Sequence, residues 1–240
     1  MLAITLDIDW APDYAIDAAA DRLREAGVKA TWFVTHASPA VDRLRESPGL
    51  FELGIHPNFF EGSEHGESLG DVLAHVKGLV PEARSIRSHG LYQSSRLLTA
   101  IARDERLETD VSLFLPGHPD LRPVTLRLPA GPIVRVPYFW SDDHEMAQAD
   151  PAWSVEPLLA GGGLKVLNFH PVHVFLNAAD TAPYSAVQAA SASLRQADRA
   201  VAERHVHPGP GTRVAFDEAV EHLRRAGTSA TISDIADAAH

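Results

Sequence analysis

Short apolar runs rich in β-branched residues recur along the chain at intervals of about 20 to 35 residues, and helical patterns fill the intervals. Parallel strands need such crossovers, so the alternation is typical of a parallel sheet flanked by helices. We expect strands at 3–9, 28–35, 51–56, 85–89, 109–113, 133–140 and 164–170, with a short last strand at 229–232. The pattern predicts an α/β fold whose sheet is closed, or nearly closed, into a barrel.

The connections are mostly helical in pattern. Helices are expected near 13–26, 40–46, 68–78, 95–106, 151–160, 185–205 and 214–226. The segment Leu115–Pro132 carries five prolines, which predicts a long irregular connection. There is no internal repeat or linker, so residues 1–240 are predicted to form a single domain, a size at which α/β barrels commonly stay undivided.

Composition narrows the partners and the chemistry. A net charge of −11 argues against nucleic acid and anionic membranes as partners. The absence of cysteine excludes disulfides, thiolate metal sites and cysteine nucleophiles, so any metal must be held by His, Asp or Glu. No secretory leader pattern and no run of about 18 apolar residues is found, which predicts a cytoplasmic protein. The sequence leaves homo-oligomerisation open.

Ionisable side chains gather where the expected strands end. Because the carboxyl ends of barrel strands and the loops after them form the active site, these side chains are expected to meet. Side chains alternate along a strand, so Asp7 and Asp9 are expected on one face. Two carboxylates at so short a distance favour a cation between them. The strand-end residues are Asp7, Asp9, His36, His56, Arg87, His89 and His170.

Each of these residues also has an ordinary structural interpretation. The aspartates could cap a helix or pair with arginine, His56 could be a loop histidine, and His170 could be a hydrogen-bonded core histidine. Taken together, they favour a metal-dependent hydrolase, with one aspartate on the metal and the other in proton transfer. Arg87 is expected to orient an aspartate and lower its pKa, and His170 to act as the general acid.

The ordered set of motifs resembles the polysaccharide deacetylase, or NodB-homology, superfamily of carbohydrate esterases, and within it the WbmS-like branch. Thr5-Leu6-Asp7-Ile8-Asp9 resembles the first motif T-F-D-D-G with Ile8 inserted. Ala30–Val34 is similar to the second-strand motif A-T-F-F-V, and Glu52–His56 resembles E-I-G-x-H. Further similarities cover essentially the whole chain and lie at Arg87-Ser88-His89-Gly90, Leu167–Pro171 and Ser229–Asp234.

The resemblance implies a deformed (β/α)7 barrel that binds one divalent metal, most often zinc. It implies that Asp9 and His56 are metal ligands and that Asp7 is the general base. It further implies that Arg87 braces Asp7 and that His170 protonates the leaving amine.

The sequence departs from the family pattern at three places. The second metal histidine would stand four residues after His56, where this chain has Phe60, so His65 is predicted as the third ligand, with His36 as the alternative. His89-Gly90 replaces a Pro-Tyr pair, and the backbone N–H near Gly90 is expected to hold the oxyanion. An additional His173 follows His170. We assign Trp10, Asn58, His89, Gly90 and His173 to substrate binding.

The predicted activity is hydrolysis of an N-acetyl group from an amino sugar, present in a small saccharide, a nucleotide sugar or a glycan precursor. Two alternatives stay open. One is a metal-dependent hydrolase of linear or cyclic amides on a small metabolite. The other is a non-catalytic sugar-binding relative, suggested by Phe60 in a ligand position.

Overall fold

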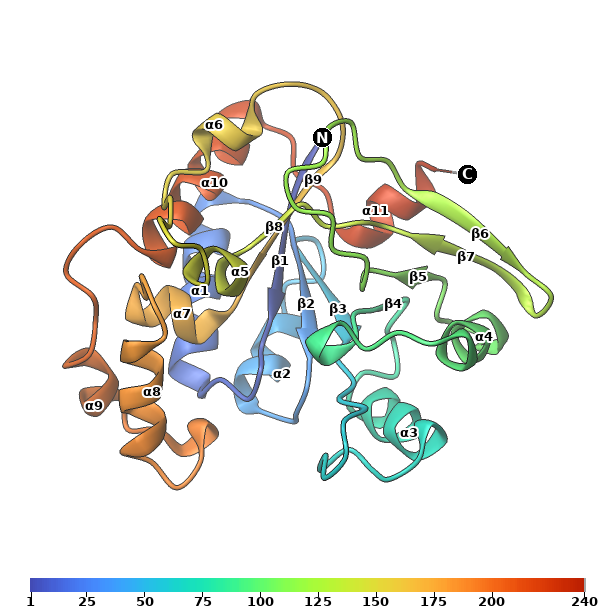
Figure 1. Cartoon of the computed structure of the whole chain (residues 1–240), viewed down its shortest axis with the longest axis horizontal. Coiled ribbons are helices and arrows are strands. Elements are labelled where there is room, and N and C mark those ends of the chain that lie inside the picture. Colours follow the sequence, from blue (N-terminus) through green and yellow to red (C-terminus); the bar gives the residue numbers. More distant parts are fainter. Residues whose placement is uncertain (240) are drawn as a thin grey trace.

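The fold is built on one sheet that curls around a central core (Figure 1). The structure is a computed structural model, and it describes residues 1–239. The strand order is β6-β7-β5-β4-β3-β2-β1-β9-β8, and all neighbours are parallel except the β6–β7 hairpin. The strands are β1 (Leu2–Asp7), β2 (Ala30–Val34), β3 (Phe51–Ile55), β4 (Ser85–Ile86), β5 (Thr109–Asp110), β6 (Val124–Leu128), β7 (Gly131–Arg135), β8 (Trp140–Ser141) and β9 (Lys165–Phe169).

The barrel is closed by backbone hydrogen bonds around Tyr138 rather than by a regular strand pair. The Tyr138 N–H donates to the carbonyl of Leu113 (2.9 Å), and the Tyr138 carbonyl accepts from the N–H of Leu115 (3.0 Å). One residue later, the Phe139 N–H donates to the carbonyl of Val166 in β9 (2.8 Å). The segment before β8 therefore joins the two sides of the sheet, and the predicted deformed (β/α)7 barrel is confirmed.

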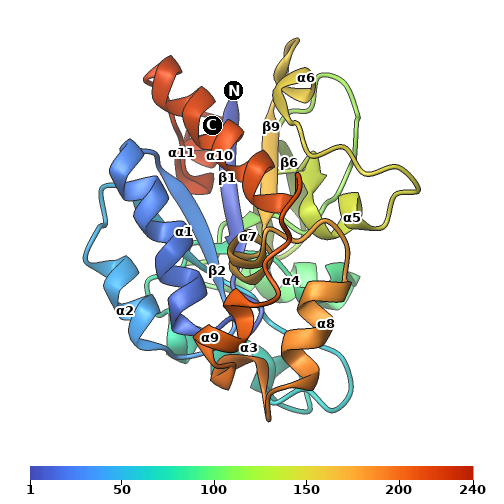
Figure 2. The same ribbon diagram turned by 90° about the vertical axis from the view of Figure 1, so that its left-hand side faces the viewer.

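Helices cover the outer surface of the sheet, and α1 and α10 lie side by side across it in Figure 2. Helix α1 buries a stripe of small and aliphatic residues and ends at Gly27, whose φ of 64° suits glycine. The helices are α1 (Asp13–Ala26), α2 (Pro39–Arg45), α3 (Leu69–Leu79), α4 (Ser95–Arg103), α5 (Asp142–Met146), α6 (Glu156–Leu159), α7 (Pro171–Leu176), α8 (Ala182–Ala189), α9 (Arg199–Glu203), α10 (Thr212–Ala226) and α11 (Ile232–Asp237).

The central strands β1, β2 and β9 are buried almost throughout. Strands covered on both faces are expected to be nearly continuous apolar runs, and β1, β2 and β9 have this pattern. The few polar residues inside them are therefore conspicuous. Thr5, Asp7 and Asn168 are at most 4% exposed, and all three belong to the hydrogen-bond network at the carboxyl end of the sheet.

Four sequence predictions of secondary structure are wrong. The single strand expected at 133–140 is two strands, β7 and β8, which are not neighbours in the sheet. The proline-rich connection contains β6, because Pro123 and Pro129 flank the strand and do not interrupt it. The long helix expected at 185–205 is broken into α8, a 3-10 turn and α9. The last strand expected at 229–232 is instead the approach to α11, where Thr231 and Asp234 form a capping box.

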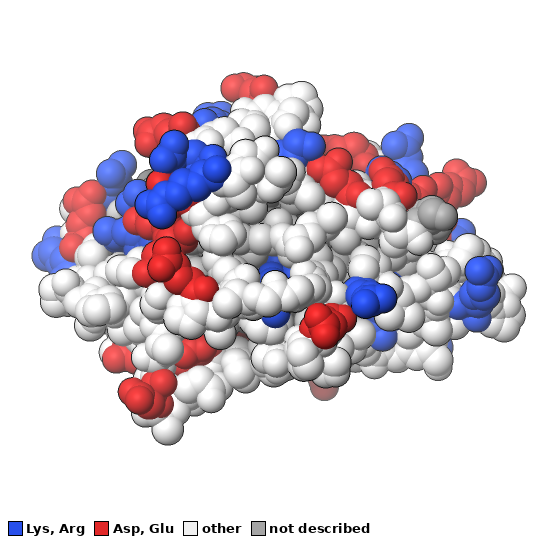
Figure 3. All heavy atoms as spheres, turned by 90° about the horizontal axis from the view of Figure 1, so that it is seen from above, with Lys and Arg blue, Asp and Glu red and all other residues white. Residues whose placement is uncertain are grey.

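The end of the barrel where β1 begins is seen in Figure 3, with basic and acidic side chains interspersed around its rim. Neither sign of charge dominates this face. Within residues 1–239, no helix is both long enough and apolar enough to cross a lipid bilayer.

Candidate active site

The carboxyl ends of β1, β3 and β9 bring the strand-end residues together, as the sequence predicts. Asp9, however, does not lie on the strand. β1 ends at Asp7, and Asp9 (φ 33°) and Trp10 (φ 55°) form a left-handed turn beyond it. Asp7 and Asp9 do face the same side, since their carboxylates lie 3.8 Å and 3.1 Å from His56 Nε2, but the turn rather than alternation along the strand places Asp9 there. Left-handed backbone is unfavourable for residues other than glycine and often occurs at functional sites.

Asp7 is held by hydrogen bonds on both carboxylate oxygens. Arg87 donates to Oδ1 (2.9 Å), and the Asn168 side-chain amide donates to Oδ2 (2.9 Å). Arg87 also donates to the Asn168 amide oxygen and to the Thr5 hydroxyl (3.0 Å). The carboxylate of Asp7 is therefore fixed in position and remains close to His56, whose Nε2 lies 3.8 Å from its Oδ2.

Arg87 is only 1% exposed and lies between two aromatic rings. Its guanidinium carbon is 4.5 Å from the ring centroid of Phe33 and 4.5 Å from that of Tyr138. Stacking on aromatic faces suits the planar guanidinium, and a buried charge requires a partner. Arg87 is thus placed against Asp7 as the sequence predicts.

His56 presents one defined ring nitrogen to the carboxylates. It is 2% exposed, and its Nδ1 donates to the backbone carbonyl of Arg87 (2.6 Å). That hydrogen bond leaves Nε2 as the free nitrogen, and Nε2 lies 3.1 Å from Asp9 Oδ1. A backbone hydrogen bond on the far nitrogen is the usual way in which a metal-binding histidine is oriented.

Asp9 is surrounded by three histidines. Its Oδ1 is 3.1 Å from His56 Nε2 and 3.2 Å from His89 Nδ1, and its Oδ2 is 3.5 Å from His170 Nε2. Burial by itself would raise the pKa of Asp9, but hydrogen bonds from His170, His56 and His89 hold it well below its usual value. Asp9 is therefore an ionised carboxylate among imidazoles.

His170 is bound from behind by Asp142, the first residue of α5. Its Nδ1 donates to Asp142 Oδ1 (2.6 Å), and its backbone N–H donates to Asp142 Oδ2 (2.8 Å). Burial opposes the charged imidazolium, but Asp142 and Asp9 outweigh it and raise the pKa of His170 well above its ordinary value. The free Nε2 faces the site, so this imidazole can carry a proton there.

A cavity of about 330 Å³ opens beside these groups. Carboxylates, imidazoles and aromatic rings from both sides of the barrel converge on it. Its wall is formed by Asp7, Asp9, His56, Arg87, Ser88, His89, Gly90, Leu91, Phe114, Tyr138, Ser141, Asp143, His144, Asn168 and His170.

Two groups among the described residues have the composition of a metal site. In the first, ligand atoms of Asp9, His56 and His89 lie within 4.8 Å of one another, and in the second, those of Asp142, His170 and His173 do. The first fits a divalent cation, because it offers one carboxylate, one oriented imidazole nitrogen and a second imidazole at the cavity wall. His89 reaches this position on a 3-10 turn (His89–Leu91) in which Gly90 has φ 57°.

His65 and His36 do not join this group. His65 is 2% exposed and both of its ring nitrogens have backbone partners: Nδ1 accepts from the Asn58 N–H (3.0 Å), and Nε2 lies 2.8 Å from the Thr35 carbonyl. His36 is also buried, and its Nδ1 lies 2.9 Å from the Thr35 hydroxyl. Both histidines therefore stabilise the loops near the site.

The residues assigned to substrate binding lie at different distances from the cavity. His89 and Gly90 form part of its wall. Trp10 packs edge-on against His89, with ring centroids 5.3 Å apart, at the margin of the site. Asn58 uses its side-chain oxygen to accept the Phe60 N–H (3.0 Å), so its side chain is engaged in its own turn.

His173 is not part of the cavity wall. Its Nδ1 lies 3.3 Å from Asp142 Oδ2, and its ring is 4.9 Å from that of His170. His173 therefore lies behind His170, on the same side as Asp142. A substrate in the cavity would meet His170 first.

Sequence reasoning missed Asp142 and Asn168, although both carry a signal. Asn168 interrupts the apolar run of β9, and a polar residue in such a strand needs a buried partner. Asp142 follows the apolar segment that ends in β8, which makes it another strand-end carboxylate. The adjacent Asp143 and Glu145 make the segment resemble an ordinary solvated helix start.

The fold and the site together define a hydrolase-like α/β barrel of the polysaccharide deacetylase type. A family model described as WbmS-like polysaccharide deacetylase matches residues 4–188, and the chain belongs to this family. No curated protein matches this chain. Family membership supports an enzyme that deacetylates a sugar.

Solved structures agree with this assignment. WbmS from Bordetella bronchiseptica, described as a polysaccharide deacetylase involved in O-antigen biosynthesis, is 31% identical, with a TM-score of 0.78 over 92% of this chain and 90% of that one. A protein from Mycobacterium smegmatis described as a polysaccharide deacetylase shares the fold at 16% identity, with a TM-score of 0.61 over 99% and 88% of the two chains. The Bc1960 peptidoglycan N-acetylglucosamine deacetylase shares it at 13% identity, with a TM-score of 0.52 over 98% and 86%.

Proposed function

We propose that this protein is a metal-dependent N-deacetylase that hydrolyses the acetamide of an amino sugar. The observation that carries the proposal is the convergence of Asp9, His56 and His89 beside Asp7 on one side of the cavity and His170 on the other. A hydrolase needs a water activator, a base and an acid around one reacting carbonyl, and these side chains supply that set.

We propose that Asp9, His56 and His89 hold the cation, most often zinc in this family. His89 replaces His65 in this proposal, because both ring nitrogens of His65 have backbone partners and His89 Nδ1 lies 3.2 Å from Asp9 Oδ1. When bound, a divalent metal lowers the pKa of a coordinated water and polarises the amide carbonyl.

Asp7 is the proposed general base. Arg87 and Asn168 hold both of its oxygens, so the carboxylate is oriented before the substrate arrives. It takes the proton of the attacking water while Gly90, at the cavity wall, offers its backbone N–H to the oxyanion. Losing one oxyanion donor typically costs about 3 kcal/mol of barrier.

His170 is the proposed general acid. An amine cannot leave as an anion at neutral pH, so a proton must reach the nitrogen as the carbon–nitrogen bond breaks. Nε2 of His170 faces the cavity, and Asp142 holds Nδ1. The charge of Asp142 favours the imidazolium that donates this proton.

Acetate release from N-acetylated saccharides, measured together with bound metal, tests the proposal. The purified chain is expected to bind about one divalent ion and to release acetate from an N-acetyl sugar. Both properties should be lost in Asp9→Asn. Release of amine or ammonia from cyclic ureides without acetate release would favour the small-metabolite alternative. Saccharide binding without stoichiometric metal, unchanged in Asp9→Asn, would favour a non-catalytic relative.

A further inference from the structure

The cavity has a second wall that the proposed chemistry does not use. It is formed by Phe114 and Tyr138 from the segments that close the barrel, and by Asp143 and His144 from α5. These residues lie across the cavity from the β1 and β3 ends, and we call them the closure wall.

The closure wall presents connected aromatic surface. The rings of Phe114 and Tyr138 stack with centroids 4.5 Å apart and an interplanar angle of 22°, and His144 meets Phe114 edge-on at 4.9 Å. Tyr138 also contacts Arg87, whose guanidinium carbon lies 4.5 Å from its ring centroid. Phe114 and His144 are only partly buried and remain available to a ligand. Apolar ring surface of this kind packs against the C–H face of a sugar.

Asp143 adds a hydrogen-bond acceptor to this surface. Its Oδ1 accepts from the Ser141 hydroxyl and from the N–H of His144 (2.8 Å), which fixes the side chain. Its Oδ2 has no hydrogen-bond partner among residues 1–239. A fixed carboxylate with a free oxygen at a cavity wall is suited to accept hydrogen bonds from hydroxyl groups.

Charge on the closure wall is unfavourable for an anionic ligand group, because Asp143 is its acidic residue and it contains no Lys or Arg. Arg87 is the single Lys or Arg residue among those that form the whole cavity wall, and its donors are occupied by Asp7, Asn168, Thr5 and the Val111 carbonyl. The His170 imidazolium, another cation of the cavity wall, faces Asp9 and Asp142. A phosphate held against Asp143 would therefore meet a like charge, which is unfavourable.

Cavity size limits the ligand further. A volume of about 330 Å³ is at the lower end of the roughly 300–1,000 Å³ common for small-molecule sites. Such a cavity has room for one sugar ring with its acetamide, and further rings of a chain would lie outside it.

We propose that the closure wall selects one uncharged N-acetylated sugar ring, with Phe114 against its C–H face and Asp143 on its hydroxyl groups. This inference rests on the proposed function for the position of the acetamide at the metal side. It places one ring of the saccharide in the cavity, and it disfavours a ring that carries a phosphate beside Asp143.

Proton NMR on the metal-replete chain tests the proposal, because one spectrum reports both saturation transfer to a saccharide and released acetate. The probes are N-acetylglucosamine, N-acetylgalactosamine and N-acetylglucosamine 6-phosphate. We expect at least one neutral sugar to bind the wild-type chain about tenfold more tightly than the phosphorylated one. Asp143→Asn should weaken neutral binding about tenfold and narrow that difference, because a charge-assisted hydrogen bond is lost.

Phe114→Ala should weaken neutral binding about fivefold through lost apolar contact. The matched control is Asp150→Asn, the same change at an exposed carboxylate outside the cavity wall. Thermal unfolding checks that each variant is folded. Equal binding in Asp143→Asn, Phe114→Ala and the control would overturn the proposal. Tighter binding of the phosphorylated sugar, or no binding of either neutral sugar, would also overturn it.

The two proposals fail separately in this experiment. Saccharide binding that depends on Asp143 without acetate release would refute the deacetylase function and leave the sugar-selecting wall intact. Acetate release that is unchanged in Asp143→Asn and Phe114→Ala would leave the function intact and refute the wall.

Discussion

Two clusters in this protein have the same composition and different surroundings. Asp9 with His56 and His89, and Asp142 with His170 and His173, each join one carboxylate to two imidazoles. The side chain of Asp9 is 22% exposed and lies on the cavity wall, whereas that of Asp142 is 0% exposed.

The difference lies in how the carboxylate oxygens are used. Both oxygens of Asp142 accept hydrogen bonds from His170, one from its ring and one from its backbone. Asp9 faces free imidazole nitrogens and the open cavity. The arrangement at Asp142 orients a proton donor, and the arrangement at Asp9 can receive a cation. Residue types alone do not separate a metal site from an acid–base pair.

The largest expected effect is that of removing the Asp9 carboxylate from the cluster of Asp9, His56 and His89, which we call the open cluster. Asp9→Asn should lower metal affinity at least a hundredfold and reduce acetate release below detection, because a charged ligand is lost. Asp142→Asn is the comparison, and it should keep one metal per chain. Metal analysis after gel filtration measures both, and loss of metal in Asp142→Asn would break the contrast between the clusters.

Changes at the acid should affect rate and spare the metal. His170→Gln is expected to lower kcat by about 10² to 10⁴, the usual contribution of a general acid, with metal content unchanged. The variant should hydrolyse a substrate whose leaving group departs without protonation at a rate closer to that of the wild-type protein. If the variant lost its metal and retained its rate, His170 would belong to the open cluster instead.

The third ligand can be assigned by a matched pair. His89→Gln should weaken metal binding by about 10- to 100-fold, whereas His65→Gln should leave it within a few-fold, since the imidazole of His65 is engaged by the backbone. Titration with zinc in the presence of a competing chelator gives both affinities. The opposite order would restore His65 as the ligand.

The last expected effect concerns stability in acid and lies outside both clusters. Burial, assisted by the charge of Arg195, lowers the pKa of His36 to about 4. The unfolded chain then binds this proton from about pH 6.5 downward while the folded chain does not, so the contribution is lost as pH falls through this window. Up to about 3 kcal/mol should disappear.

His36→Asn should flatten that pH dependence, and the same change at exposed His118 should not. Urea unfolding at pH 7, 5.5 and 4 measures the free energy of unfolding. Parallel curves for the wild type and His36→Asn would contradict the assignment.

Sequence reasoning found the residues whose position follows from the sheet. The parallel strands carry Asp7, His56 and Arg87 to the same end, and periodicity is enough to predict that meeting. It also predicted that His170 would close the site from β9. The barrel itself followed from the alternation of apolar runs and helices, and the family comparison confirms it.

What could not be predicted depends on local backbone geometry and on contacts between distant segments. The left-handed turn at Asp9 and the 3-10 turn that carries His89 have no periodic signal. The closure around Tyr138 is a contact between distant segments. His89 is proposed as the ligand instead of His65 because backbone groups bind both imidazole nitrogens of His65. A sequence does not show such contacts.

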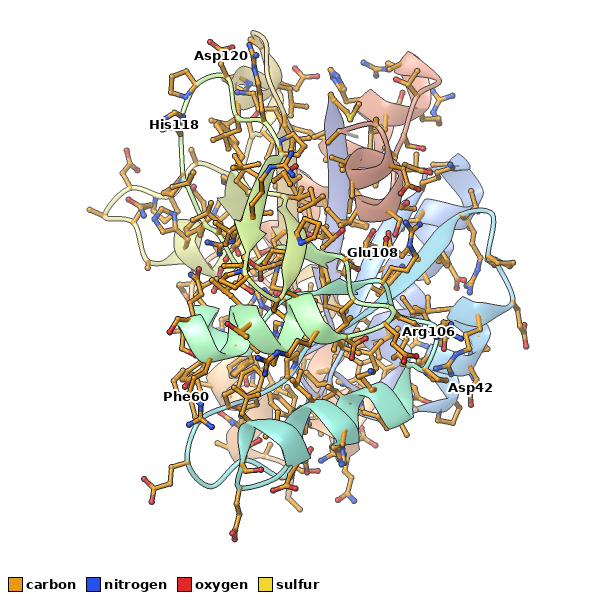
Figure 4. All side chains as sticks on the ribbon, turned by 90° about the vertical axis from the view of Figure 1, so that its right-hand side faces the viewer. Asp42, Phe60, Arg106, Glu108, His118 and Asp120 are labelled. Carbon is orange, nitrogen blue, oxygen red and sulfur yellow. The ribbon has the colours of Figure 1, made fainter. Side chains whose placement is uncertain are left out.

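Phe60 stands where the resembling motif has a histidine, and it projects from the loop after β3 (Figure 4). A Cβ added at Gly90 would lie 2.6 Å from the Phe60 ring, so this ring supports the turn that carries His89 from outside. The side chain at 60 and the turn that carries His89 are therefore coupled by packing. A smaller side chain at 60 would leave this turn without its aromatic contact, and a side chain at 90 would displace the Phe60 ring.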